Sequence, residues 1–284
     1  MASTASTSVL ASSASTIDDS GTVRFTNVQD LFKTIDSTTR DSLTVTYVSL
    51  NHFTEIESTR EKQRRKFRFR YYDSNSQILI IAIPTGLHEQ LHIWLYMEYF
   101  GQVDDMGLKR SWISIASTTF SARQGNSGRI SKEGDSTGRP MPERAAKGTW
   151  PTLIIEAGVS ETLGQLRLDM RRWFSISNHD VKIVLLAKFD GTKILLEKWE
   201  EDIQARPGAT TTRRSVQQQE PILKQSIIIS QNTTTHPVSY DVTSGALILS
   251  FRLLFLRDPC DGEGDFVISV QELKEYAEII WAQV

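Results

Sequence analysis

The chain has 284 residues, of which 39% are hydrophobic and 23% charged, and its formal net charge is −2. This length fits one α/β domain with additions, and the near-neutral charge excludes a uniformly basic coat protein for nucleic acid. The single cysteine, Cys260, excludes a disulfide scaffold and a multi-cysteine zinc site, and no apolar run reaches the ~20 residues of a membrane helix. We therefore expect an intracellular globular protein, cytoplasmic or nuclear, with no membrane contact.

The first segments are expected to lie outside the main domain. Residues 1–22 are rich in Ser, Thr and Ala and lack the basic residues and long apolar core of a secretory signal, so we expect a disordered tail. A small N-terminal extension is expected over 23–65, with an amphipathic segment at 28–35 and a strand at 43–50. The main domain then covers 66–284.

A dense basic run, REKQRRKFRFR, occupies residues 60–70. Phe67, Phe69 and Tyr71 alternate with polar or charged neighbours, which predicts a half-buried strand in a hairpin with residues 77–83. Two interpretations of this run stay open. Its side chains bind phosphates and stack on bases, or they form a solvated strand face that protects a sheet edge.

The core of the main domain is expected over 84–200, followed by C-terminal strands and a helix over 221–284. In chain order we expect a helix at 86–100, a strand at 112–121, a loop at 124–149 with a short strand near Asp135, a strand at 152–159, a helix at 162–176, strands at 181–189 and 192–200, a loop at 201–220, strands at 222–230 and 246–256, and a helix at 270–282. Thr162 with Gln165 and Ser269 with Glu272 have the spacing of capping boxes. This order indicates an α/β fold with a mixed central sheet flanked by helices.

Glu156 stands in an almost wholly apolar strand, TLIIEAGV, of the kind covered on both faces. A buried carboxylate is costly unless it is paired, bound to a metal, or close to solvent at a strand end. One interpretation is therefore a glutamate paired with an arginine or placed at the strand end. The other is a ligand of a hard divalent ion, for which Asp135 is the available second carboxylate.

Three segments carry a resemblance to a known family: GRISKEGDSTGRP (128–140), WPTLIIEAGVSETLGQLRLDMRRWF (150–174) and VKIVLLAKF (181–189). They resemble uncharacterised fungal proteins of the PD-(D/E)XK, restriction-endonuclease-like nuclease superfamily, over about residues 66–200 and loosely the C-terminal helix. The resemblance implies a restriction-endonuclease-like core in which Asp135 and Glu156 hold Mg²⁺ or Mn²⁺. It also implies metal-dependent phosphodiester hydrolysis, with nucleic acid as the partner.

The sequence departs from the family at the position two residues after Glu156. Active members have a lysine there, whereas this chain has Gly158. Arg167 and Arg171, four residues apart on one helix face, are the candidates for the missing basic role. The alternative is that they are ordinary surface charges and that the protein is a non-catalytic module that binds nucleic acid or an unidentified protein.

A rival motif, H-E-x-x-H, spans residues 88–92 on the helix expected at 86–100. On a helix this spacing puts two histidines on one face with a glutamate beside them, as in zinc metalloproteases. The histidines, however, follow Pro84 at the very start of the helix, and no downstream motif supplies a third ligand. A zinc metalloprotease is therefore the most distant of the three functional hypotheses.

Overall fold

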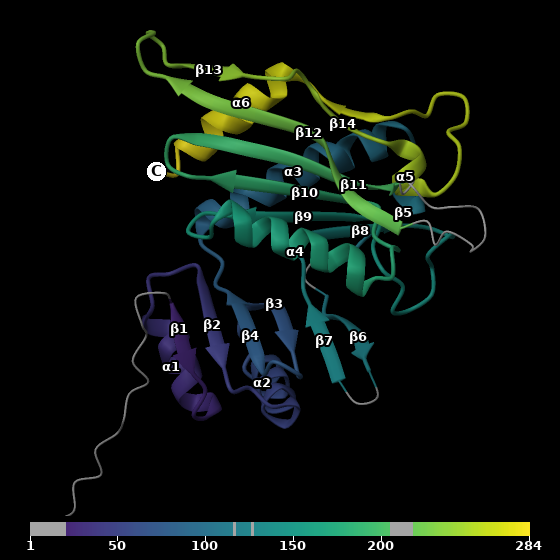
Figure 1. Cartoon of the computed structure of the whole chain (residues 1–284). Helices are drawn as coiled ribbons and strands as arrows, with labels where there is room; N and C mark the ends of the chain where they lie inside the picture. Colours follow the sequence, from purple (N-terminus) through teal and green to yellow (C-terminus); the bar gives the residue numbers. More distant parts are fainter. Residues whose placement is uncertain (1–20, 116–117, 126–127, 205–217) are drawn as a thin grey trace, which may run out of the picture.

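The structure is a computed structural model that describes residues 21–115, 118–125, 128–204 and 218–284. Its fold is α/β, with two main sheets that lie beside each other (Figure 1). Most of the tail expected at 1–22 lies outside the described residues. None of the helices described is long and apolar enough to cross a membrane.

The smaller sheet has two helices on one face. Its strands, in spatial order, are β1 (Thr22–Arg24), β2 (Ser42–Thr46), β4 (Ile78–Ala82), β3 (Arg68–Asp73), β7 (Gly128–Lys132) and β6 (Phe120–Gln124). α1 (Val28–Ser37) and α2 (Leu50–Lys62) pack on it through a shared core that contains Phe32, Phe53 and Phe69. The boundary expected at residue 66 therefore falls within one sheet and one core, because β2 pairs with β4.

The predicted hairpin is present as β3 and β4, but its alternation is interrupted. The register shifts between Phe69 and Tyr71, so Arg70 is the extra residue of a β-bulge. An extra residue reverses the faces of those that follow it. Tyr72, and not Tyr71, therefore stacks on Phe53 in the core, with 3.9 Å between ring centroids. The predicted alternation is wrong beyond Phe69, and Arg70 extends toward the larger sheet.

The larger sheet is mixed and has helices on both faces. Its strands, in spatial order, are β13 (Ser239–Val242), β12 (Gln218–Asn232), β11 (Lys193–Gln204), β10 (Ile183–Phe189), β9 (Leu153–Gly158), β8 (Ser136–Pro140) and β5 (Trp112–Ser114). β9 and β10 are parallel and the other pairs antiparallel. α4 (Leu163–Ile176) covers one face, and α3 (Gly86–Asp105) and α6 (Val270–Trp281) cover the other.

Elements with strong periodicity were predicted correctly, whereas several short ones were not. The expected loop at 124–149 contains β7, whose Gly, Ser and Lys residues carry no apolar alternation, and β8, which corresponds to the short strand expected near Asp135. The strand expected at 112–121 is two strands, β5 and β6, that belong to different sheets. The strand expected at 246–256 is β14 (Leu247–Leu249), which pairs with β15 (Phe266–Ile268), followed by the short helix α5 (Phe251–Phe255). A 3-10 turn, η1 (Lys109–Ser111), precedes β5. The expected loop at 201–220 falls mostly on residues 205–217, which lie outside the described ranges.

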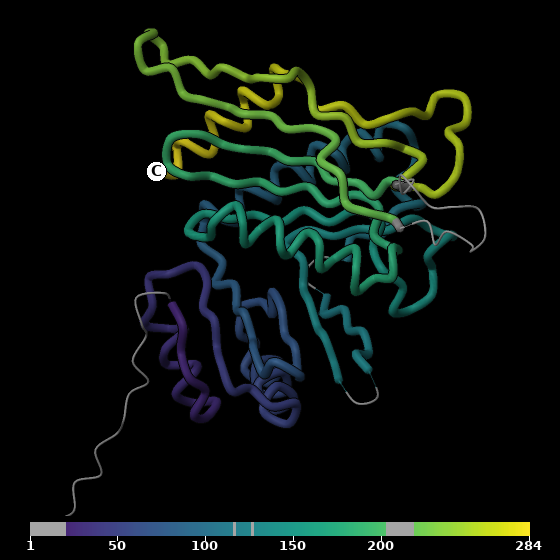
Figure 2. The backbone as a smooth tube through the Cα atoms, viewed as in Figure 1, coloured from purple at the N-terminus to yellow at the C-terminus, as the bar shows by residue number. Residues whose placement is uncertain are grey.

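The chain passes repeatedly between the two sheets (Figure 2). It leaves the smaller sheet after β4 to form α3 and β5, returns for β6 and β7, and crosses again at residues 133–135 to enter β8. The backbone N–H of Ser160 donates to Asp41 Oδ2 at 3.0 Å and ties the loop after β9 to the segment before β2. Asp135 therefore lies on a crossing, where both sheets contribute neighbours to it.

Candidate functional site

Asp135 is buried at the junction of the two sheets, with 6% of its surface exposed. Its Oδ2 accepts the backbone N–H of Ala157 at 2.9 Å, and its Oδ1 accepts from Arg68 at 2.8 Å. The preceding residue is Gly134, where a Cβ would lie 2.6 Å from Thr137 Cγ2, so the tight crossing requires a glycine. β9 and β3 thus fix both oxygens of this carboxylate.

Two histidines of α3 face the same carboxylate. His88 and His92 are four residues apart, so they share one helix face, and each is 1% exposed. His88 Nε2 lies 3.2 Å from Asp135 Oδ1. His92 contacts Ser136 Oγ through Nδ1 at 2.8 Å and Glu89 Oε1 through Nε2 at 3.3 Å.

These three side chains form a group that is able to hold a metal ion. One ligand atom from each of His88, His92 and Asp135 can be chosen so that all lie within 4.8 Å of one another. The H-E-x-x-H motif was noted from the sequence, but the third candidate ligand, Asp135, lies on the crossing between β7 and β8 and does not belong to a second motif. Burial would lower the pKa of His88, but the negative charge of Asp135 outweighs it and raises that pKa.

Glu156 points to the other side of β9, toward α4. It is 1% exposed, and its Oε1 accepts a hydrogen bond from the indole N–H of Trp173. Among the residues that the structure describes, the cation that forms an ion pair with it is Lys132, whose Nζ lies 4.0 Å from Oε1. Burial, together with the negative charge of Asp135, raises the pKa of Glu156 to about 7. This carboxyl group is therefore only partly ionised at neutral pH.

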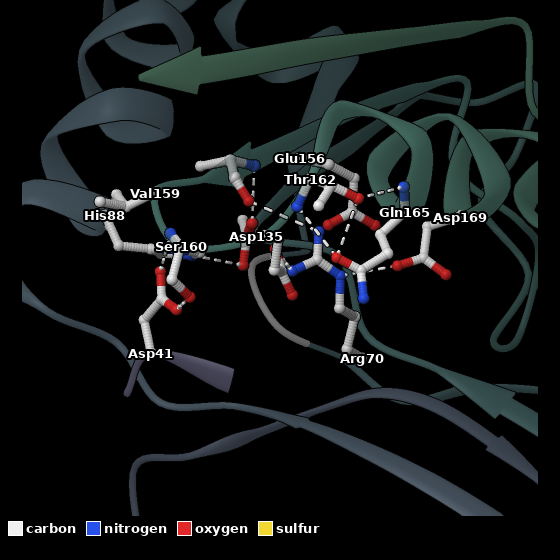
Figure 3. A network of polar contacts seen from close by, with 12 residues as sticks. Asp41, Arg70, His88, Asp135, Glu156, Val159, Ser160, Thr162, Gln165 and Asp169 are labelled. Atoms are coloured by element: carbon white, nitrogen blue, oxygen red, sulfur yellow. Dashed lines mark hydrogen bonds and ion pairs between the residues drawn. The ribbon is translucent and has the colours of Figure 1, made fainter. Parts of the chain in front are cut away.

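Arg70 is a second buried positive charge near this acid. Its guanidinium reaches out of the β-bulge and binds Glu161 and, at 2.7 Å through Nε, Asp169 of α4. Lys132 Nζ lies 3.5 Å from Asp169 as well, and both cations are buried. In Figure 3, Asp135 lies between His88 on one side and Arg70 on the other. The two sheets are therefore joined by a buried network of opposite charges.

A cavity of about 610 Å³ opens beside this network. It lies where α2 ends, β3 begins and α3 starts. The cationic side chains that line it are Arg60, Arg64, Arg65, Lys66 and Arg68, and the acidic ones are Glu61, Glu89 and Glu133. Arg68 and Glu89 belong both to the cavity wall and to the surroundings of Asp135, because Arg68 binds Asp135 and Glu89.

The other predicted site residues do not join the group formed by His88, His92 and Asp135. Asp135, directly before β8, and Glu156, in the neighbouring strand β9, influence each other's charge, as expected for a pair, but they bind different partners. Arg167 forms an ion pair with Glu197 of β11 and does not reach Asp135 or Glu156, and Arg171 is exposed to solvent. Gln165 closes the predicted capping box of α4 with Thr162.

Gly158 stands where active PD-(D/E)XK proteins have a lysine, and in this chain the position is closely packed. A Cβ there would lie 2.8 Å from Leu166 Cδ1, because α4 packs closely against this end of β9. A lysine at this position would therefore require Leu166 or α4 to shift. Among the described residues, the cation nearest to Glu156 is instead Lys132, three residues before Asp135 in the same SKEGD stretch.

A hard ion such as Mg²⁺ prefers ionised oxygen ligands and keeps several waters. Glu156 meets neither condition, since it is buried, partly protonated and bound by Trp173. Both oxygens of Asp135 already accept hydrogen bonds. The donor set between these two carboxylates therefore does not fit Mg²⁺, whereas the imidazole side of Asp135 offers nitrogen ligands.

Sequence reasoning missed the cations that complete the site. Arg68 and Arg70 were interpreted as one face of a strand, and Lys132 as part of a loop. The signal that could have found them was charge, since so basic a segment next to a buried acidic pair predicts ion pairing. No protein-family model matches this chain, and no curated protein matches it either. The resemblance to PD-(D/E)XK proteins therefore rests on the three sequence segments alone.

Proposed function

We propose that this protein is a metal-dependent phosphodiesterase that acts on nucleic acid, as the resemblance implies. The observation that carries the proposal is the cationic cavity next to Asp135. Five Lys and Arg side chains line a space of about 610 Å³, which is large enough for a nucleotide unit. Phosphates supply most of the affinity of nucleic acids for basic surfaces.

The cavity has side chains for binding as well as for chemistry. Arg64 and Lys66 are exposed at its rim, and no ion pair is recorded for either among the described residues, so they are free to meet phosphates. Arg60 is held by Glu133, which it binds at 2.8 Å through each terminal nitrogen. Arg60, which Glu133 holds in place, and the exposed Arg64 and Lys66 together supply three positive charges to one wall of the cavity.

Glu89 is the residue best placed to accept a proton. It lines the cavity and contacts both His92 and Arg68. Burial would raise the pKa of Glu89, but the hydrogen bond with His92 and the charge of Arg68 outweigh burial and lower it. A metal ion on Asp135 would polarise a phosphoryl oxygen and activate water. Glu89 would then take the proton of the attacking water.

A second candidate function is a non-catalytic module that binds nucleic acid in the same cavity. The observation that favours it is that the acidic side chains are already paired with cationic side chains of the protein. Arg68 binds Asp135, while Arg70 and Lys132 neutralise the acids near Glu156. Gly158 adds to this, because it has no side chain to orient water. The cationic wall favours a phosphodiester over a peptide in both cases, so the metalloprotease is not proposed.

The test measures binding and cleavage separately on the full chain. Fluorescent single- and double-stranded DNA and RNA are offered with Mg²⁺, Mn²⁺ or Zn²⁺. The variant Asp135→Asn should lower the cleavage rate at least about a hundredfold, a typical size for loss of a group that acts in the transition state. The matched control Asp241→Asn, at an exposed position, should leave it unchanged.

Binding is tested by charge reversal at the cavity rim. Arg64→Glu combined with Lys66→Glu should weaken oligonucleotide binding and flatten its dependence on log salt by about 1.4, or ~0.7 per lost contact. Arg110→Glu, at an exposed position that does not line the cavity, is the control. Binding without cleavage under any metal would favour the non-catalytic module. Absence of binding at low salt would overturn both candidate functions.

A further inference from the structure

The geometry points to a transition-metal site formed by His88, His92 and Asp135. We propose that this site holds a divalent ion that accepts imidazole nitrogen, such as Zn²⁺ or Co²⁺, and not Mg²⁺ between the two carboxylates. The inference rests on the proposed function in one respect, because both make Asp135 a metal ligand. It adds two ligands and the class of ion.

The first argument is that two of the three candidate ligands have one atom anchored by neighbouring groups of the fold and a second atom that points toward the other candidates. Asp135 uses Oδ2 to accept the backbone N–H of Ala157 at 2.9 Å, and its Oδ1 faces α3, where Arg68 occupies it at 2.8 Å until an ion takes its place. His92 contacts Ser136 Oγ through Nδ1 at 2.8 Å, which leaves Nε2 facing Glu89. Metal-binding histidines commonly use their second ring nitrogen in this way, since the contact fixes the tautomer and the ring orientation.

The second argument is the unsatisfied ring of His88. Neither of its nitrogens makes a hydrogen bond within the described residues, although the side chain is only 2% exposed. Its Nε2 approaches Asp135 Oδ1 at 3.2 Å without hydrogen-bond geometry. Buried polar groups in proteins nearly always have a partner, and an orphaned imidazole calls for a ligand.

The third argument is distance. Two ligands on a tetrahedral ion with bonds of ~2.0–2.1 Å lie about 3.3 Å apart. The separation of His88 Nε2 from Asp135 Oδ1 is 3.2 Å, and the three ligand atoms all lie within 4.8 Å of one another. Small side-chain rotations of His92 would therefore close the site without any change in the backbone.

The ligand types decide the class of ion. Two imidazoles with one carboxylate suit Zn²⁺, Co²⁺ or Fe²⁺, whereas Mg²⁺ prefers oxygen ligands. Three protein ligands leave a fourth position open, as in catalytic zinc sites. Glu89 and Arg68 contact His92 and Asp135 and also line the cavity, so an ion would reach the site from that side.

Arg68 balances the charge of the site while no ion is bound. It donates to Asp135 Oδ1 at 2.8 Å and lies 2.8 Å from Glu89 Oε1. When an ion takes the Asp135 oxygen, Arg68 is able to keep its contacts with Glu89 at the cavity wall. Ion binding therefore exchanges one cation for another beside Asp135 and does not leave a buried charge unpaired.

The experiment measures metal binding by the full chain without nucleic acid. After treatment with a chelator, the protein is titrated with Co²⁺, followed by the visible absorption of the bound ion, and with Zn²⁺ by calorimetry. We expect one ion per chain, a Kd for Zn²⁺ at least a hundredfold lower than for Mg²⁺, and a melting temperature that rises by several degrees with Zn²⁺. His88→Asn and His92→Asn should each weaken Zn²⁺ binding at least about tenfold.

Two further variants keep the test sharp. His179→Gln, which removes an imidazole paired with Glu201 and distant from Asp135 in the fold, should leave Zn²⁺ affinity unchanged. Glu156→Gln should change it less than threefold, whereas a site between Asp135 and Glu156 would lose most of its affinity. Circular dichroism of each variant, and retained binding in the controls, separates loss of the site from loss of the fold.

The outcomes separate this inference from the proposed function. Zn²⁺ binding that depends on both histidines supports the metal site, whether or not an oligonucleotide is cleaved. Zn²⁺ binding without cleavage would reject the proposed hydrolysis and leave the metal site standing. Cleavage with Mg²⁺ that is unaffected by His88→Asn would uphold the function and overturn the site. Failure of Zn²⁺ and Co²⁺ to bind, or loss of binding in Glu156→Gln, would also overturn it.

Discussion

The carboxyl groups of Asp135, directly before β8, and Glu156, in the neighbouring strand β9, differ in their pKa shifts and in the groups that contact them. Burial would raise the pKa of Asp135, but His88, His92 and Arg68 outweigh it and lower that pKa well below its usual range. The pKa of Glu156 is raised to about 7 by burial and by the charge of Asp135. Asp135 is therefore an ion next to a cationic cavity, whereas Glu156 is a partly protonated acid packed against an indole.

This difference teaches that a sequence motif with two acids does not define two equivalent ligands. The protonation state of each carboxyl group depends on which groups donate hydrogen bonds to its oxygens and on how completely water is excluded from its side of β9. The α3 side of β9 offers imidazoles and a route to the cavity. The α4 side offers Trp173 and buried cations, and it behaves as part of the core.

The largest effect on stability is expected on the α4 side of β9, when the buried guanidinium of Arg70 is removed. Arg70→Met would leave Glu161 and Asp169 buried with too few cations, which should lower the free energy of unfolding by about 3–5 kcal/mol. Urea unfolding at neutral pH measures the loss. Arg129→Met, which removes a half-exposed pair with Glu57, is the matched control and should cost less than about 1 kcal/mol. Equal losses in the two variants would contradict this account.

The dependence of stability on pH should sharpen the contrast between the two acids. Because folding raises the pKa of Glu156, the native state keeps a proton that the unfolded chain releases between about pH 4.5 and 7. Stability contributed by this group is therefore present at low pH and is lost as pH rises through this window, by about 3 kcal/mol.

Glu156→Gln does not titrate, and its amide oxygen is still able to accept from Trp173. Relative to the variant, the wild-type chain should lose that ~3 kcal/mol on going from pH 4 to pH 8, measured by urea unfolding at several pH values. Parallel stability profiles for the two proteins would show that folding does not raise the pKa of Glu156. In that case the proposed difference between the carboxyl groups would be wrong.

The smallest expected effect concerns the packing of α4 on β9. Gly158→Ala places a methyl group 2.8 Å from Leu166 Cδ1, so the helix or the leucine has to shift. We expect a loss of about 1–2 kcal/mol in the free energy of unfolding, as for a modestly overpacked core. Gly86→Ala, at a position where a Cβ would meet no atom within 4 Å, should cause no loss. A stabilised Gly158→Ala protein would show that this end of β9 is loosely packed.

Much of the fold could be predicted because its elements have strong local patterns. The apolar run of β9, the periodic helix α4 and the Ser269–Glu272 capping box of α6 all depend on neighbours in sequence. β8 corresponds to the short strand expected near Asp135, whereas β7 was missed because its small and polar residues form a strand only through pairing with β3 and β6. The bulge at Arg70 was missed for the same reason, since nothing in RFRYY marks an extra residue.

The candidate site could be predicted only in part. Glu156 was selected as a carboxylate in an apolar strand, with Asp135 as the available second carboxylate, and the pattern H-E-x-x-H was visible in the sequence. That Asp135 joins His88 and His92 was not predictable, because the contact joins α3 to a crossing that was expected to be a loop. The missing basic role was sought on α4, in Arg167, but that side chain pairs with Glu197 on the outer part of the sheet.

The interlaced path of the chain limits how the molecule can be divided. Because β6 and β7 follow α3 and β5 but belong to the smaller sheet, any cut between β4 and β6 separates that sheet from its last two strands. Neither fragment would contain both Asp135 and the arginines of β3. Co-expressed halves should therefore regain the Asp135 cluster only by reassociating, which makes fragment complementation a direct reporter of correct docking between the sheets.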